Sequence, residues 1–206
     1  MDQLTATEAG AHKDYTGSKL GMWLFLFTEI LLFSGLFLVY SVYRSMYSRE
    51  FHAAAAGLST ALGTINTVVL LTSSLTMALA ITAIQRGKKR ASLLFQSGTI
   101  VLGLLFLVNK YFEWSGHIRE GIYPNSPLLL SQDHGHILFF GLYYVMTGLH
   151  GLHVLAGLIV LSIMLSLTAG DRIGDAAFGR LENSGLYWHL VDLIWIYLFP
   201  LFYLIT

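Results

Sequence analysis

The sequence predicts an all-α membrane protein, a polytopic bundle of five transmembrane helices with its N-terminus inside and its C-terminus outside. Hydrophobic residue types make up 55 % of the 206 residues and charged types only 12 %, where a soluble domain has about 25 %. The apolar residues gather in five long runs, and Lys plus Arg equal Asp plus Glu at 12 each. This composition excludes an ordinary soluble enzyme and a disordered chain, and it excludes a nucleic-acid partner because no basic surplus is left for phosphates.

Residues 1–19 are expected to form a polar segment on the cytoplasmic side. The stretch has no apolar core and no small-residue cleavage site, so it does not have the pattern of a secretory signal. It is not an Arg-rich transit peptide either, which favours a bacterial or archaeal plasma membrane. Residues 20–206 are expected to form the membrane domain.

Each apolar run is long enough to cross a membrane, because a span needs about 20 mostly apolar residues. The first run contains only Glu29 as a charged residue, and the second contains none. The third is uncharged until Lys110 and Glu113, near its end. The fourth is long enough to require tilt or an overhanging end, and the fifth carries Asp192 and Pro200. The expected spans are residues 20–43, 62–84, 91–114, 137–167 and 184–205.

The orientation follows from Lys and Arg in the short connections, which favour the inside of the membrane. Eight of them fall in the N-terminal segment and in the connections after the second and fourth spans, against three on the other face. The connection at residues 86–90 carries four, which makes it the strongest inside marker. Aromatic residues at the ends of the spans are expected in interfacial belts, namely Tyr40, Tyr43, Tyr111, Trp114, Tyr187 and Trp188.

Three carboxyl groups inside the spans are expected to be proton-linked or structural, because a charge at the bilayer centre costs at least about 2.5–3.5 kcal/mol. Glu29 lies near the middle of its span without a cation at that depth on its own helix, and both roles stay open for it. Glu113 follows Lys110 by three residues, a spacing that suits an ion pair snorkelling to the interface. Asp192 follows His189 by one turn, as in a structural hydrogen-bonded pair.

The histidines of the fourth and fifth spans have two interpretations. His150 and His153 lie one turn apart among glycines that let helices approach closely, so they, together with His189 and Lys110, are expected to form interhelical hydrogen bonds or contact lipid. The alternative is a b-type haem held between His150 or His153 and His189, which the bulky neighbouring residues disfavour. No metal site is expected, and the absence of cysteine excludes Cys-ligated zinc and iron–sulfur sites.

The polar motifs of the spans, taken together, resemble the short form of subunit III of the haem–copper respiratory oxidases. The fourth span carries Thr-Gly-x-His-Gly-x-His-Val at residues 147–154, and the fifth carries Tyr-Trp-His-x-x-Asp-x-x-Trp at residues 187–195. Residues 21–37, 66–74 and 110–114 resemble the corresponding parts of the first three spans. Glu29 matches the intramembrane glutamate of that family, and Glu113, His150, His153, His189 and Asp192 match its signature positions.

The resemblance implies a noncatalytic subunit of an oxidase that reduces O2 to water with proton translocation. Such a subunit has no redox centre, since haem and copper lie in partner subunits. It flanks subunit I as its main contact, with subunit II and a respiratory supercomplex as further expected partners. It also supports proton uptake and turnover stability, and it binds phospholipid in a cleft between helix groups. The two helices that complete this cleft in seven-helix relatives are missing from this chain.

Cytochrome c oxidase is the expected complex, and a quinol oxidase or a nitric oxide reductase is the alternative within the same resemblance. A function of a different class is a small proton-coupled transporter that uses Glu29, Asp192 and the histidines as a relay. The transporter is less favoured because the sequence contains no inverted repeat and only one proline within a span.

Overall fold

The structure, a computed structural model, describes residues 2–173 and 178–205, with side chains from residue 17 onward. All secondary structure in this part of the chain is helical. Five helices are long and apolar enough to span a membrane, which confirms the predicted fold class. They are α1 (Asp2–Met46), α3 (Thr60–Gln85), α4 (Lys89–Arg119), α6 (His134–Ala169) and α7 (Gly179–Tyr203), and two short helices are α2 (Ser48–Ala55) and α5 (Pro127–Leu130).

The helices are longer than the apolar runs that predicted them, except at the end of α7. α1 begins at Asp2, so the polar segment expected at residues 1–19 and the first span belong to one continuous helix. α4 and α6 likewise extend beyond residues 91–114 and 137–167 at both ends. Polar residues at the ends of these helices continue the backbone hydrogen bonding past the apolar region, and hydropathy alone does not mark that point.

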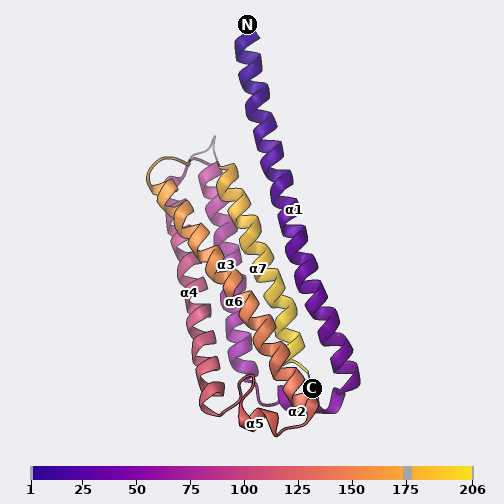
Figure 1. The fold of residues 1–206 in the computed structure, drawn as a ribbon. Coiled ribbons are helices and arrows are strands. Elements are labelled where there is room, and N and C mark those ends of the chain that lie inside the picture. The colour runs from indigo at the N-terminus through magenta and orange to yellow at the C-terminus, as the bar shows by residue number, and fades with distance from the viewer. Residues whose placement is uncertain (1, 174–177, 206) are drawn as a thin grey trace.

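The two ends of the bundle differ in their content of charged residues. The N-terminus, the α3–α4 connection and the α6–α7 connection lie at one end, and α2, α5 and the C-terminus lie at the other (Figure 1). We call the first the basic end, because it carries Arg86, Lys88, Lys89, Arg90 and Arg172. Because the number of spans is odd, the two termini lie at opposite ends of the bundle. The assignment of the basic end to the cytoplasm stays a prediction.

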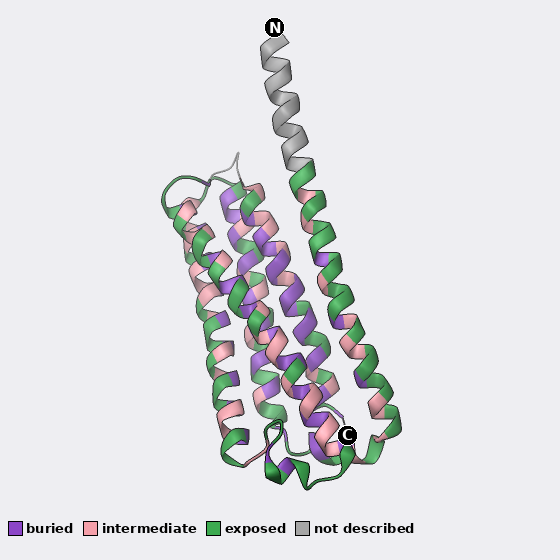
Figure 2. Cartoon of the chain, viewed as in Figure 1, coloured by how far each residue is buried: buried purple, intermediate pink, exposed green. Residues whose placement is uncertain are grey.

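α7 is the most buried of the spanning helices and α1 the least. Half of the apolar window of α7 is buried, against 11 % of that of α1. Figure 2 shows buried residues concentrated on α7 and the helices around it, whereas most of α1 is exposed along its outer side. α7 packs against α3 and α6, and α1 lies alongside α7 and α6.

Trp188 of α7 fills the centre of the bundle. It is fully buried, and its Nε1 donates to Ser73 Oγ of α3 at 3.0 Å. Glycines make room for it: a Cβ on Gly103 of α4 would lie 2.7 Å from the indole, and one on Gly157 of α6 would lie 2.9 Å from it. Close helix packing through small residues is typical of membrane bundles.

Three aromatic residues expected in interfacial belts therefore lie elsewhere. Trp188 is in the core, and Tyr40 of α1 is also fully buried, with its hydroxyl donating to the carbonyl oxygen of Leu201. Tyr187 is buried as well, and its hydroxyl donates to the carbonyl oxygen of His153. The expectation was wrong for these three because a partner within the bundle satisfies the one polar group on each ring, so that the ring no longer needs the interface. Tyr111 is 69 % exposed on α4, as a residue facing lipid would be.

Candidate functional site

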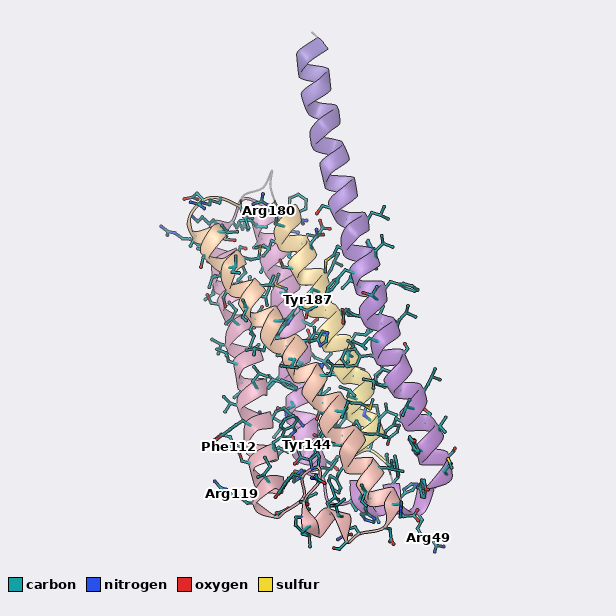
Figure 3. The ribbon with its side chains drawn as sticks, viewed as in Figure 1. Arg49, Phe112, Arg119, Tyr144, Arg180 and Tyr187 are labelled. Carbon is teal, nitrogen blue, oxygen red and sulfur yellow. The ribbon has the colours of Figure 1, made fainter. Side chains whose placement is uncertain are left out.

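Glu29 and His153 form a polar pair between α1 and α6. Glu29 Oε2 lies 2.8 Å from His153 Nε2, and both side chains are 16 % exposed. The other ring nitrogen, Nδ1, lies 2.8 Å from the carbonyl oxygen of Leu149, one turn earlier in α6. Tyr187 of α7 donates its hydroxyl to the His153 carbonyl oxygen at 3.2 Å, which ties a third helix to the same level. Figure 3 shows Tyr187 between the two ends of the bundle.

The hydrogen bonds of this pair fix how many protons it holds. A backbone carbonyl only accepts, so His153 Nδ1 must carry a proton to bond Leu149. One further proton lies between Nε2 and the Glu29 carboxyl. If this proton is on the Glu29 carboxyl, both groups are neutral. If it is on the His153 imidazole, the two groups form an ion pair. The net charge of the pair is zero in both cases. Without that proton the pair would carry one negative charge inside the membrane.

A second cluster joins Lys110 and Glu113 of α4 to Tyr143 of α6 and Tyr203 of α7. Lys110 Nζ donates to Glu113 Oε2 at 3.0 Å and to the hydroxyls of Tyr143 at 3.0 Å and Tyr203 at 2.9 Å. Both tyrosines donate to Glu113 Oε1, at 2.8 and 2.5 Å. All three ammonium protons are used, and each carboxylate oxygen has a partner. The cluster can hold three helices together.

The Lys110–Glu113 pair was expected to snorkel to the interface, and this part of the expectation was wrong. The two residues do pair, but Lys110 is only 7 % exposed and Glu113 only 6 % exposed. The reason is the pair of tyrosine hydroxyls, which take the place that interfacial water would have. Sequence reasoning missed Tyr143 and Tyr203 as partners, because both lie on other helices and spacing along the sequence indicates only contacts within one helix.

His189 and Asp192 do not bond each other. His189 Nδ1 lies 2.6 Å from the hydroxyl of Ser74 on α3, so this histidine does make an interhelical hydrogen bond. Ser74 is also near the Asp192 carboxyl without reaching hydrogen-bond geometry. Asp192 is 3 % exposed, and neither of its oxygens has a partner among the described residues. The carboxyl, unless a group outside this chain pairs with it, is stable only in its neutral form.

His150 is fully buried among aromatic rings. Its ring centroid lies 5.5 Å from that of Phe106 and 5.4 Å from that of Trp195. Neither ring nitrogen has a hydrogen-bond partner among the described side chains and backbone. The expected hydrogen bond or lipid contact of His150 is thus not made within this chain. His153 uses both ring nitrogens for Glu29 and Leu149, so the geometry does not favour haem ligation by His153.

Across residues 2–173 and 178–205, no group of three or more His, Cys, Asp or Glu side chains is arranged to hold a metal ion.

Comparison with known proteins identifies the family. Residues 3–206 match the family model described as cytochrome c oxidase subunit III. The chain belongs to this family. As a member it is a subunit III of the haem–copper oxidases, and its five spans make it a multi-pass membrane protein.

Curated relatives of the subunit III family cover nearly the whole chain. Cytochrome c oxidase subunit 3 of Synechocystis sp. is 32 % identical over 98 % of this chain and 82 % of the relative. Cytochrome bo(3) ubiquinol oxidase subunit 3 of Pseudomonas putida is 32 % identical over 90 % of this chain and 84 % of the relative. A haem–copper oxidase subunit I+III of Aeropyrum pernix is 31 % identical over 91 % of this chain, which spans only 22 % of that longer protein.

Proposed function

We propose that this subunit III is a noncatalytic component of a terminal oxidase in a bacterial or archaeal plasma membrane, where it flanks the catalytic subunit I. The family match across residues 3–206 carries the proposal. Haem and copper belong to the partner subunits, subunit II is a further partner, and phospholipid binds this chain directly. The complete pairing of Lys110 and Glu113 supports a structural role for this cluster, and the single shared proton of Glu29 and His153 supports a proton-linked one.

The proposed contact with subunit I draws on the fused relative. The Aeropyrum pernix protein is named as subunits I and III in one chain, and this chain matches part of it at 31 % identity. A covalent connection keeps two domains at high effective concentration, which favours a direct contact between them. Cytochrome c is the proposed electron donor, in keeping with the family description, although relatives include ubiquinol oxidase subunits.

Co-purification from the native membrane tests the proposal. The chain, tagged at one terminus and extracted in mild detergent with added lipid, is expected to bring down a large haem-bearing subunit, identified by its haem spectrum and by mass spectrometry. A copper-bearing subunit II in the same preparation supports cytochrome c as the donor, and a copper-free one points to quinol. Recovery of the chain by itself from lipid-rich conditions contradicts the accessory role.

Glu29→Gln is expected to leave assembly intact and to lower sustained turnover of the complex. Glutamine keeps the shape, and its amide can donate to His153 Nε2, so the α1–α6 hydrogen bond is retained. It cannot carry or release the shared proton, and this loss is the reason for the slower turnover. Oxygen consumption is followed over many turnovers at several pH values. Thr28→Val is the matched control, because its exposed hydroxyl bonds only the Phe25 carbonyl oxygen at 2.7 Å.

A proton-linked role for Glu29 would be contradicted by equal turnover in Glu29→Gln and the Thr28→Val control. A purely structural role predicts this equality, since the glutamine preserves the contact. Lower turnover accompanied by a lower yield of assembled complex also argues for the structural role.

A further inference from the structure

A small pocket lies at the end of the bundle opposite the basic end, where Figure 1 shows α2 and α5. Its volume is about 190 Å³. Residues of three helices line it, among them Ala53 and Ala54 of α2, Leu129 of α5, and His136 and Phe140 of α6. The pocket is thus enclosed where three separate elements meet.

Hydrogen bonds hold the α5 side of the pocket in place. Ser126 Oγ donates to the Gly121 carbonyl oxygen at 2.5 Å and accepts from the Leu129 backbone N–H at 3.1 Å. Tyr144 of α6, which Figure 3 shows near this end of the bundle, donates its hydroxyl to the Ile122 carbonyl oxygen at 2.8 Å. The segment before and within α5 is therefore fastened to itself and to α6. A ligand would enter a pocket that the fold has already formed.

The lining favours a small and neutral ligand. No Lys, Arg, Asp or Glu lines the pocket, so a charged ligand would lose its water without gaining a counter-ion. Gln132 and His136 are the polar members of the lining, and neither the amide nor the ring has a hydrogen-bond partner among the described residues. On α6 the lining spans only one turn, from His136 to Phe140, so an extended chain has no groove to follow.

An aromatic ring suits this pocket better than water does. The volume would hold about six waters, and each buried water needs two to four polar partners, more than two side chains supply. A dry cavity of about 150 Å³ is known to hold one benzene molecule, so this pocket has room for one ring with a small substituent. The Phe140 ring in the lining offers the stacked or edge-on contact that aromatic pairs prefer.

We propose that this pocket binds a neutral phenol, a single aromatic ring with a hydroxyl group, with the ring against Leu129 and Phe140 and the hydroxyl at Gln132 and His136. A phenolic hydroxyl donates and accepts, so it can pair with an amide and with either tautomer of an imidazole. A ring in this place bridges α2, α5 and α6 and stabilises this end of the bundle by mass action. The site depends neither on subunit I nor on phospholipid.

The opposing interpretation is that the pocket is only a gap in the packing between α2 and α5. A phenol would then dissolve in the lipid around the protein and would have no site on it. That interpretation predicts uptake that never saturates, and the same uptake by every variant. It also predicts no dependence on the hydroxyl beyond the difference in lipid solubility.

The test titrates para-fluorophenol into the full chain in lipid nanodiscs and follows its fluorine NMR signal, with empty nanodiscs as the blank. Saturable binding at one site is expected. Fluorobenzene, which has the ring without the hydroxyl, is expected to bind roughly two- to ten-fold more weakly, the range that one hydrogen bond accounts for.

Two sets of variants locate the binding in this pocket. Ala53→Phe puts a ring into the pocket from an exposed position and is expected to abolish saturable binding, whereas Ala56→Phe, at an exposed residue outside the lining, is its matched control. Gln132→Leu with His136→Phe is expected to remove the preference for para-fluorophenol over fluorobenzene. His134→Phe, also exposed and outside the lining, is the control for the histidine and is expected to keep the preference.

Several outcomes overturn the proposal. Uptake that does not saturate does so, and so does binding that is unchanged in Ala53→Phe. Equal affinities for para-fluorophenol and fluorobenzene overturn the assignment to a phenol. The midpoint of thermal unfolding gives a reading that needs no variant: para-fluorophenol is expected to raise it for the unmodified chain, and an unchanged midpoint at concentrations that saturate the NMR signal contradicts a ligand that bridges the three helices.

Discussion

Glu113→Gln is expected to destabilise the bundle by about 3–5 kcal/mol, because it leaves the Lys110 ammonium charged and without its counter-ion in the interior. Lys110 is 7 % exposed and lies 3.0 Å from Glu113 Oε2. The two tyrosine hydroxyls that bond Lys110 also bond Glu113. The change therefore disturbs contacts among α4, α6 and α7 together. The midpoint of thermal unfolding in detergent, followed by tryptophan fluorescence, measures the loss.

The double variant Lys110→Met/Glu113→Gln tells a buried ion pair from a general packing effect. Removal of both charges takes away the uncompensated ion, so the double variant is expected to recover most of the stability lost in the single one. A double variant whose loss of stability equals the sum of the losses in Lys110→Met and Glu113→Gln would contradict this explanation. Lys89→Met is a useful comparison, since its pair with Asp171 is exposed and such pairs contribute only about 0–1 kcal/mol.

Gly103→Ala is expected to cost about 1–3 kcal/mol by overpacking the centre of the bundle. The added methyl would lie 2.7 Å from the Trp188 ring and 2.8 Å from Leu158 Cδ2. Trp188 has little freedom to move away, since Gly157 on α6 contacts it from another helix and its Nε1 is bonded to Ser73. The thermal midpoint of the purified chain or complex measures the effect.

Gly98→Ala on the same helix is the matched control for this substitution. A Cβ there would meet no heavy atom within 4 Å. The change is therefore expected to leave stability unchanged or raise it by up to about 1 kcal/mol, the difference in helix propensity. Similar losses at both positions would show that the helix backbone, and not the fit around Trp188, is responsible.

Hydropathy predicted the spans well because the length of the hydrocarbon core sets the length of each apolar run. It predicted the helix ends less well, since polar residues such as those before Gly17 in α1 continue the helix outside the apolar region. Local spacing predicted the Lys110–Glu113 pair, because residues three apart share a helix face.

Contacts between helices were not predictable in the same way. Glu29 bonds His153 and His189 bonds Ser74, and each pair is more than a hundred residues apart in the sequence. Helix rotation and tilt decide these partners, and both depend on how side chains pack against Trp188 and its glycines. A serine in an apolar helix also gives no sign of whether its hydroxyl bonds its own backbone or a neighbouring helix.

The peripheral place of α1 predicts two cooperative units of unequal stability in the bundle. α1 contacts α6 and α7 along one flank, and only 11 % of its apolar window is buried, against half of that of α7. Local unfolding begins where few contacts are lost, so α1 is expected to detach first. Its mid-depth polar tie to the core is the Glu29–His153 bond, and loss of the shared proton would leave an uncompensated charge at that junction. A hydrogen-exchange profile is therefore expected to show the amides of α1 opening at lower free energy than those of α7.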